Sequence, residues 1–309
     1  MYKFDDMEVI HPIKLALTQT GKTMKGFKFL PLFKPASVIL KMVQGLLTIL
    51  IFGGQSLYDN CTVDFLYKIS VNFKHSRKET HCTLYKKTKL SNPPDCLEQK
   101  GQVPTGRVGH TLTKLSDSSC LLIGGYATKQ NCIPQNLDDQ ANIYMLNVEE
   151  MSWEQKPLGE NSNLRGIFGH TTNCLPDGKV CVIGGAFMQG HGLRFADIGK
   201  PIILSLQSTN VIETQIHLNI QAPLPLYDHC CAIDGKNIYV FGGRNASGIK
   251  KQFVSINIES KNVDIDDSAP DDAASAGASM HLFGDRHPKS TVLVEEHLSV
   301  TIWHHLIVV

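Results

Sequence analysis

The sequence predicts an all-β protein, a β-propeller of about six blades in which four blades are clear and the terminal ones degenerate. The first observation is a short apolar run that ends in a pair of glycines and recurs at intervals of about 60 to 70 residues. The second is a histidine that stands ahead of three of these runs. A small four-stranded sheet cannot bury both of its faces alone, so the copies must pack against one another. The glycine pairs are Gly53-Gly54, Gly124-Gly125, Gly184-Gly185 and Gly242-Gly243, and the histidines are His110, His170 and His229.

The second blade is the clearest of the series. An alternating segment at 111–115 predicts its first strand, and the apolar run at 121–123 predicts its second. Residues 143–148 predict a third strand, and the segment around Trp153 predicts a fourth. Tyr144 and Trp153 are therefore expected to be structural residues of this blade.

The glycine pairs have a mechanical reason to recur. Each apolar strand must end in a tight reversal, where a positive φ and close backbone packing favour residues that lack a Cβ. A phosphate cradle would instead need a Gly-x-Gly-x-x-Gly segment at the start of a helix, and the sequence does not show one. The pairs are thus expected to serve the structure and not to bind a nucleotide.

The rest of the chain is placed around these blades in order. Residues 1–28 are expected to form a degenerate first-blade fragment or an extension, and residues 29–309 the propeller. The pattern is regular over 29–260 and degenerate after 261. Two polar stretches, 128–140 and 188–199, are expected to be loops available for interaction. Strands of the first blade are expected at 37–42, 47–54, 65–73 and 80–87.

The densest positive cluster in the sequence lies between the last two strands of the first blade. It reads Lys74-His75-Ser76-Arg77-Lys78, and Lys86, Lys87 and Lys89 follow. Such a cluster is compatible with a solvated hairpin tip. It is also compatible with phosphate contact, because loop tips are where a propeller presents binding groups. The residues alone leave both interpretations open.

Composition narrows the functional classes. The 30 basic and 29 acidic residues nearly balance, so any surface for nucleic acid must be local. The nine cysteines include no Cys-x-x-Cys pair, which argues against a zinc finger and favours a reducing, intracellular compartment. No apolar segment follows a basic N-terminal start, so a signal peptide is not expected. The most apolar window, 36–52, is too short and too polar for a membrane span.

A catalytic constellation is not apparent in the sequence. The three histidines could be interpreted as metal ligands, but a residue that recurs once per blade is far more often a packing or hydrogen-bonding element. Neither a Ser/His/Asp order nor a pair of carboxylates occurs in a matched context. We therefore expect a protein that is not an enzyme, with no cofactor and no bound metal.

The glycine pairs, together with Tyr144 and Trp153, resemble kelch repeats. Within that class the chain resembles the second subunit of the V(D)J recombination-activating complex and its transposon-borne relatives. Three segments carry this resemblance over residues 29–260: a Leu-Pro-Leu loop before an alanine-led strand at 29–38, a basic hairpin after a tyrosine-containing strand at 67–78, and a Val-Pro lead into Arg-x-Gly-His at 103–110. No Cys/His array follows the propeller segment, as in invertebrate, transposon-type members that lack the plant-homeodomain finger, so histone reading is not implied.

The resemblance implies a non-catalytic accessory subunit in the nucleus. It would bind the catalytic recombinase or transposase subunit, as a heterotetramer with two copies of each, and would assist DNA binding during recombination or transposition. Contacts to the DNA backbone are implied for four residues of the basic hairpin. These are Lys74, His75, Arg77 and Lys78.

The alternative is a generic kelch scaffold for protein interactions, of a cytoskeletal, signalling or ubiquitin-ligase adaptor kind. Adaptors normally carry a helical dimerisation domain ahead of the propeller, and the residues available before the first blade are too few for one. Beyond that point, only the basic hairpin and the order of the family-like segments distinguish the two possibilities.

Overall fold

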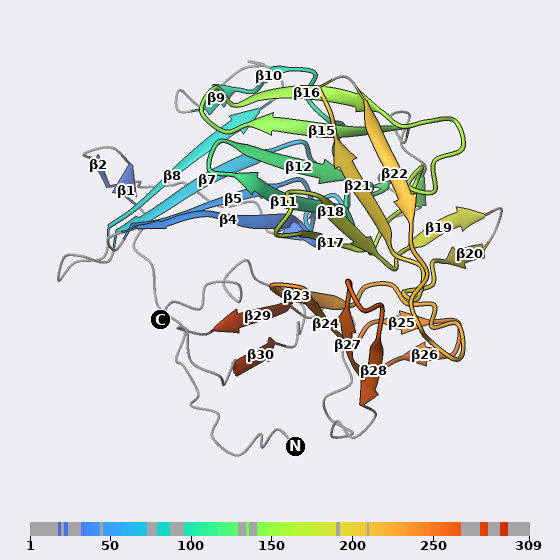
Figure 1. Cartoon of the computed structure of the whole chain (residues 1–309). Helices are drawn as coiled ribbons and strands as arrows, with labels where there is room; N and C mark the ends of the chain where they lie inside the picture. Colours follow the sequence, from blue (N-terminus) through green and yellow to red (C-terminus); the bar gives the residue numbers. More distant parts are fainter. Residues whose placement is uncertain are drawn as a thin grey trace.

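The computed structural model describes residues 18–19, 22–23, 32–43, 46–72, 79–86, 96–128, 134–135, 141–189, 192–208, 210–266, 279–283 and 291–295. Within these ranges every regular element is a β-strand (Figure 1). The chain is thus all-β, as the alternating apolar pattern predicts.

Four sheets form the blades of a propeller, and each contains four consecutive antiparallel strands. Blade 1 comprises β4 (Ala36–Val43), β5 (Leu46–Phe52), β7 (Leu66–Asn72) and β8 (Glu79–Lys86). Blade 2 comprises β11 (Thr111–Ser116), β12 (Ser119–Ile123), β15 (Asn142–Asn147) and β16 (Ser152–Pro157). Blade 3 comprises β17 (Thr171–Cys174), β18 (Val180–Ile183), β21 (Ile202–Leu206) and β22 (Val211–Gln215). Blade 4 comprises β23 (Cys230–Asp234), β24 (Asn237–Phe241), β27 (Phe253–Asn257) and β28 (Val263–Asp266).

Short strands extend this frame at both ends of the chain. β28 completes blade 4 beyond residue 261, the point at which the sequence pattern weakens. A two-stranded sheet follows, formed by β29 (Ser279–Phe283) and β30 (Thr291–Glu295). Of residues 1–28, the described part is the pair β1 (Thr18–Gln19) and β2 (Lys22–Thr23). The outer strands of blades 1 and 2 each carry a parallel strand, β9 (Cys96–Glu98) on β8 and β10 (Lys100–Gly101) on β16.

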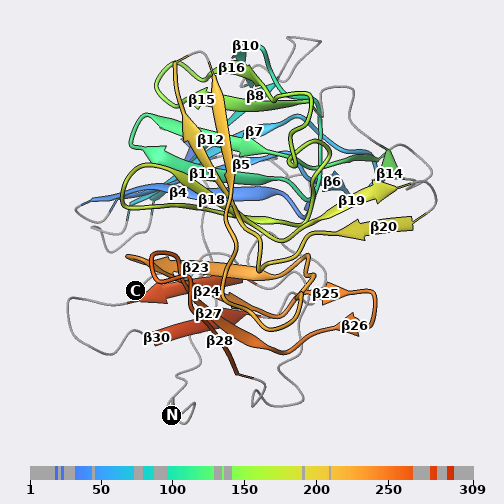
Figure 2. The same ribbon diagram turned by 45° about the vertical axis from the view of Figure 1, so that its right-hand side comes forward.

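The first strand of each blade lies on the inside of the propeller. β4, β11, β17 and β23 pack against one another in sequence, and β29 lies beside β23 (Figures 1 and 2). The chain enters all four first strands from the same end of the blades, which is also the end where the glycine pairs lie. We call this end the axis mouth.

Short two-stranded sheets extend from the axis mouth (Figure 2). The stretch 188–199 is expected to be a loop, but its described residues up to Phe195 belong to a small hairpin. Residues 196–198 instead bond to 224–226, ahead of blade 4. Of the stretch 128–140 the structure describes residue 128 and residues 134–135, which take part in one short strand pair. The paired strands at this end are β3 (Leu32–Phe33) with β6 (Gln55–Ser56), β13 (Ala127–Thr128) with β14 (Pro134–Gln135), β19 (Ala186–Gln189) with β20 (Gly192–Phe195), and β25 (Arg244–Asn245) with β26 (Gly248–Ile249).

The hydrophobic core lies between the blades and not within them. Successive side chains of a strand point to opposite faces, so the second strand of a blade serves two cores. In β12, Leu122 belongs to the core shared with blade 1, whereas Leu121 and Ile123 belong to the core shared with blade 3. A third core joins blades 3 and 4 through residues such as Ile183 and Val240. Burial of both faces explains why these strands are continuous apolar runs.

The glycine pairs of blades 1, 2 and 3 pack closely against the next blade. Gly124 and Gly125 follow β12 with φ of 66° and 96°, as expected for a tight reversal. The structure adds a reason that the sequence did not show: a Cβ on Gly124 would lie 2.2 Å from the carbonyl oxygen of Ile167 in blade 3. The amide of Gly125 donates to that same oxygen at 2.7 Å. Gly54 donates likewise to Arg107, and Gly185 to Leu226.

Replacing Gly124 by alanine should therefore lower the free energy of unfolding far more than φ alone requires. The matched control is Gly178→Ala, because Gly178 has a similar φ of 80° but open space where its Cβ would stand. We expect a loss of about 1 kcal/mol for Gly178→Ala from the backbone conformation, and about 3 kcal/mol or more for Gly124→Ala from conformation plus overpacking. Urea denaturation checks both, and equal losses would contradict the role of the inter-blade contact.

Candidate functional site

The three repeat histidines occupy equivalent places, each directly before the first strand of its blade. His170 is hydrogen-bonded through Nε2 to Thr111 Oγ1 of the preceding blade at 3.0 Å, and His229 to Thr171 Oγ1 at 2.9 Å. The corresponding residue of blade 1 is Ala36, which has no hydroxyl. His110 therefore donates its Nε2–H to the backbone oxygen of Phe52 instead, at 3.1 Å. Each histidine thus joins its blade to the one before.

Burial keeps these imidazoles uncharged. It lowers the pKa of His110 and His170 from 6.5 to about 3, and that of His229 to about 4. Their Nδ1 atoms are buried and have no hydrogen-bond partner in the described part of the chain. The described residues contain no group of three or more His, Cys, Asp or Glu arranged to hold a metal ion. The geometry of these side chains is that of packing elements between blades.

Tyr144 and Trp153 are both buried, as expected of structural residues. The Trp153 ring lies 5.1 Å from that of Phe52, centroid to centroid, and its Nε1 donates to Gln99 Oε1 at 2.7 Å. Tyr144 lies under the guanidinium of Arg107, at 5.3 Å. Gln99 has no counterpart in the repeat pattern, and sequence reasoning missed it.

Arg107 belongs to the Arg-x-Gly-His segment, and it is the largest fully buried side chain among the described residues. Its Nη1 donates to the carbonyl oxygen of Gly124 at 2.9 Å, and its Nε donates to that of Thr105 at 3.0 Å. Ile167 and Leu226 occupy the equivalent positions of the next two blades and are also buried. Arg107 is therefore a buried structural residue and is not available to a ligand.

The cysteines beside the apolar strands behave as core residues. Cys181 and Cys230 are buried, and Cys174 and Cys231 are partly buried. Burial raises the pKa of the Cys231 thiol to about 12, and it also raises that of Cys181. These thiols are therefore poor nucleophiles.

The basic hairpin, residues 74–78, lies outside the described residues, so its geometry is not tested. The strands that it joins are described, and they end at Asn72 and Glu79 at the end of blade 1 opposite the axis mouth. The exposed Lys41 lies near the same end of the blade. Lys41 pairs with Thr48, close to the start of β5, and the first residue of β5, Leu46, pairs with Asn72. We call this region, with Lys41 and Lys114, the basic end of blade 1.

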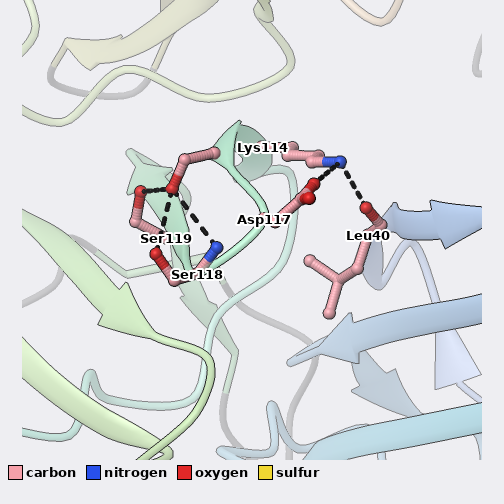
Figure 3. Close-up of polar contacts among 6 residues, drawn as sticks. Leu40, Lys114, Asp117, Ser118 and Ser119 are labelled. Atoms are coloured by element: carbon pink, nitrogen blue, oxygen red, sulfur yellow. Dashed lines mark hydrogen bonds and ion pairs between the residues drawn. The ribbon is translucent and has the colours of Figure 1, made fainter.

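Lys114 connects the first two blades at this end (Figure 3). Its Nζ donates to the carbonyl oxygen of Leu40 and lies 2.7 Å from Asp117 Oδ1. Leu40 accepts this bond where the pairing of β4 with β5 shifts register, between Ile39 and Lys41. A hydrogen bond from Lys114 lowers the pKa of Asp117, and the charges of Lys114 and Lys41 lower it further. Lys41 and Lys114 therefore both act on one exposed turn.

No helix long and apolar enough to cross a membrane occurs in the described ranges.

Comparison with known proteins identifies the repeat. A family model described as "KLHDC2/KLHL20/DRC7 Kelch-repeats domain" matches residues 109–282, more than half of the chain. Among solved structures, the chain is similar to one in "Cryo-EM structure of RAG in complex with one melted RSS and one unmelted RSS", with a TM-score of 0.56 and 18% identity. That similarity covers 88% of this chain and 81% of the other, and at such low identity it supports a shared fold alone. No curated protein matches the sequence.

The buried histidines predict a loss of stability in acid. Because the folded pKa values lie below 6.5, the stability that neutral histidine contributes is fully present above pH 6.5 and is lost as the pH falls toward about 3 to 4. Each histidine adds up to about 1.4 kcal/mol per pH unit to the slope within that window. His170→Gln should remove one such contribution, measured by urea denaturation at several pH values.

Thr111→Val is the matched control for this measurement. It removes the hydroxyl that binds His170 but keeps the imidazole, so it should lower stability at every pH and leave the slope nearly as in the parent protein. A His170→Gln variant with an unchanged slope would show that this histidine does not titrate as described.

Proposed function

We propose that this chain, which belongs to the KLHDC2/KLHL20/DRC7 Kelch-repeats domain family, is a non-catalytic, protein-binding propeller that acts as the accessory subunit of a recombination-activating or transposase DNA endonuclease complex. In this proposal it binds the catalytic subunit, as two copies of each chain in the nucleus, and helps that subunit to hold DNA. The carboxylates and metal ions that cut DNA belong to the partner.

The observation that carries the proposal is the basic end of blade 1. Its hairpin sequence and the Val-Pro lead into His110 resemble the second recombination-activating subunit in order and spacing. Asn72 and Glu79, the described residues on either side of the hairpin sequence, lie at the end of blade 1 near Lys41 and Lys114, which supports the proposal. Positive side chains at one end of a blade can contact successive phosphates without distorting the sheet.

Such contacts would position DNA without reading its sequence. Lysine and arginine bind phosphate as charges and release counterions, which adds affinity for all sequences alike. Reading of bases requires side chains that reach base edges in a groove. Sequence preference is therefore assigned to the catalytic subunit, and the propeller supplies affinity and orientation.

A generic kelch scaffold is the second candidate, favoured by family membership itself. Kelch propellers serve as scaffolds for protein interaction, and nothing in the repeat pattern requires DNA. The two candidates differ in the partner: one predicts a transposase-type catalytic subunit, the other a cytoskeletal, signalling or ubiquitin-ligase protein.

Co-purification with a candidate catalytic subunit, followed by DNA binding, tests the proposal. We expect a stable complex whose DNA affinity falls, for all sequences alike, when Lys74, Arg77 and Lys78 are replaced by alanine. The salt dependence of binding should flatten by up to about one slope unit per lost phosphate contact. Stability of the propeller should change by no more than about 0.5 kcal/mol, because exposed substitutions cost little.

The matched control replaces Lys179, Lys200 and Lys236, exposed lysines of blades 3 and 4, by alanine. It removes the same charge and should leave the salt slope nearly unchanged. Absence of the complex would favour the generic scaffold. If the complex forms and the hairpin replacement changes neither its DNA affinity nor its salt slope, the hairpin does not contact DNA.

A further inference from the structure

The outer strand of blade 3, β22, is the edge of its sheet (Figure 1). Just beyond this strand, the amide of Ile216 donates to the oxygen of Pro201. Because backbone groups alternate in direction along a strand, the even-numbered residues of β22 direct theirs at β21 and the odd-numbered residues direct theirs away from the sheet. Among the described residues, no other strand or loop pairs with these outward groups, which belong to Val211, Glu213 and Gln215.

The outer strands of blades 2 and 4 have a backbone partner at the equivalent place. In each of these blades, the segment that leads into the blade runs parallel to the outer strand. Lys100 lies beside Ser152 in blade 2, and Asn219 lies beside Asn262 in blade 4. The amides of both lead-in residues donate to the outer strand, at 3.0 Å in blade 2 and at 2.8 Å in blade 4. In blade 1, β9 pairs with the outer strand in the same parallel sense.

Within the described residues, blade 3 lacks this cover. The segment that leads into it, residues 158–166, bonds to blade 2 and to itself instead. The amide of Leu158 donates to the oxygen of Ala141, and the amide of Ser162 donates to that of Gly159. The outer edge of blade 3 is therefore a parallel binding edge that the chain fills elsewhere and leaves open here.

Glu213 has the position in blade 3 that Trp153 has in blade 2. Each lies opposite a fully buried leucine of the third strand, Leu204 in blade 3 and Leu146 in blade 2. In blade 2 the lead-in segment covers this position, and its Gln99 side chain accepts a hydrogen bond from the Trp153 ring nitrogen at 2.7 Å. A segment laid on blade 3 in the same way brings the corresponding side chain to a carboxylate. This position therefore favours lysine or arginine.

Ile212 points to the opposite face of the same edge, since successive side chains of a strand alternate. It is 46% exposed. In a parallel pair, the residue that directs its backbone groups at β22 lies beside Ile212, as Lys100 lies beside Ser152 in blade 2. An apolar, β-branched side chain at that position covers Ile212. The two faces of the edge thus favour different side chains, in strict alternation.

We propose that the outer edge of blade 3 binds an extended segment of a partner protein as a fifth, parallel strand, in which basic residues alternate with β-branched apolar ones. The apolar residues direct their backbone groups at Val211 and Glu213 and cover Ile212, and the basic residues meet the Glu213 carboxylate on the other face. This inference goes beyond the proposed function and does not depend on it, because the site lies on the outside of blade 3.

A second copy of this chain is a poorer occupant of the edge. Two copies related by a two-fold axis would pair their β22 strands antiparallel. The register that pairs all five residues of β22 sets Glu213 directly opposite the same residue of the second copy. Like charges directly opposite one another are destabilising. A basic segment meets no such repulsion.

The test uses the full chain and three labelled hexapeptides that alternate lysine and valine, with binding followed by fluorescence anisotropy. One peptide is unmodified, the second is N-methylated at its valines, and the third is N-methylated at its lysines. We expect the valine-methylated peptide to bind at least about tenfold more weakly than the unmodified one, because the amides that face β22 are lost. The lysine-methylated peptide is the matched control and should stay within about threefold, because its blocked amides face away from the edge.

Substitutions in β22 test the side-chain contacts. Glu213→Gln should weaken binding of the unmodified peptide by about threefold to fivefold, and by less when salt is raised to about 0.3 M. Ile212→Thr keeps the β-branched shape and should weaken binding by about twofold to fourfold. The matched control is Glu149→Gln in the outer turn of blade 2, which removes the same exposed charge and should leave the affinity within about twofold. Thermal unfolding verifies that each variant is folded.

Equal losses from the two methylated peptides, or equal effects of Glu213→Gln and Glu149→Gln, would overturn the proposal. A dimer in sedimentation velocity that the unmodified peptide dissociates would also overturn it, because the occupant would then be a second copy of the chain. These probes involve neither the basic hairpin nor a catalytic subunit, so their failure is distinct from a failure of the proposed function.

Discussion

The propeller depends on how closely one blade approaches the next at the axis mouth. At each joint a glycine amide donates to a carbonyl oxygen of the following blade, and the first glycine of the pair leaves no room for a Cβ. The histidine of the following blade packs against that glycine as well, its Cε1 lying 2.8 Å from where a Cβ on Gly124 would stand. A four-stranded sheet with both faces apolar is stable only when its neighbours are this close, so glycine and histidine recur together.

This joint also determines the protonation of the histidines. They fill the space between blades, where desolvation holds them neutral, and so they connect strands without introducing charge. Their second ring nitrogens, the Nδ1 atoms, are buried and have no hydrogen-bond partner in the described part of the chain, which lowers the stability that each histidine contributes. Arg107 is the charged exception, since its guanidinium is buried but reaches two backbone oxygens and the Tyr144 ring.

The two ends of the blades carry different charged residues. The strands between them are packed on both faces, so charged side chains gather at the ends. At one end, Lys41 and Lys114 gather by the strands that carry the basic hairpin. At the other, Lys34, Asp228 and Arg244 form a compact ion cluster. Propellers present binding groups on loops held by a fixed scaffold, and the residues at the two ends of these blades can be mutated separately.

Local pattern in the sequence was enough to predict the strands, the glycine pairs and the equivalence of the three histidines, because each follows from side-chain period or backbone conformation within one blade. The same reasoning extended Gly53 and Gly54 into a strand, although β5 ends at Phe52 and both glycines have positive φ. Only the tertiary structure paired Lys34 with Asp228, or Trp153 with Gln99, since these contacts join segments with no common local pattern. Curvature of the propeller brings the starts of distant strands to one axis, and that closeness creates the ion cluster.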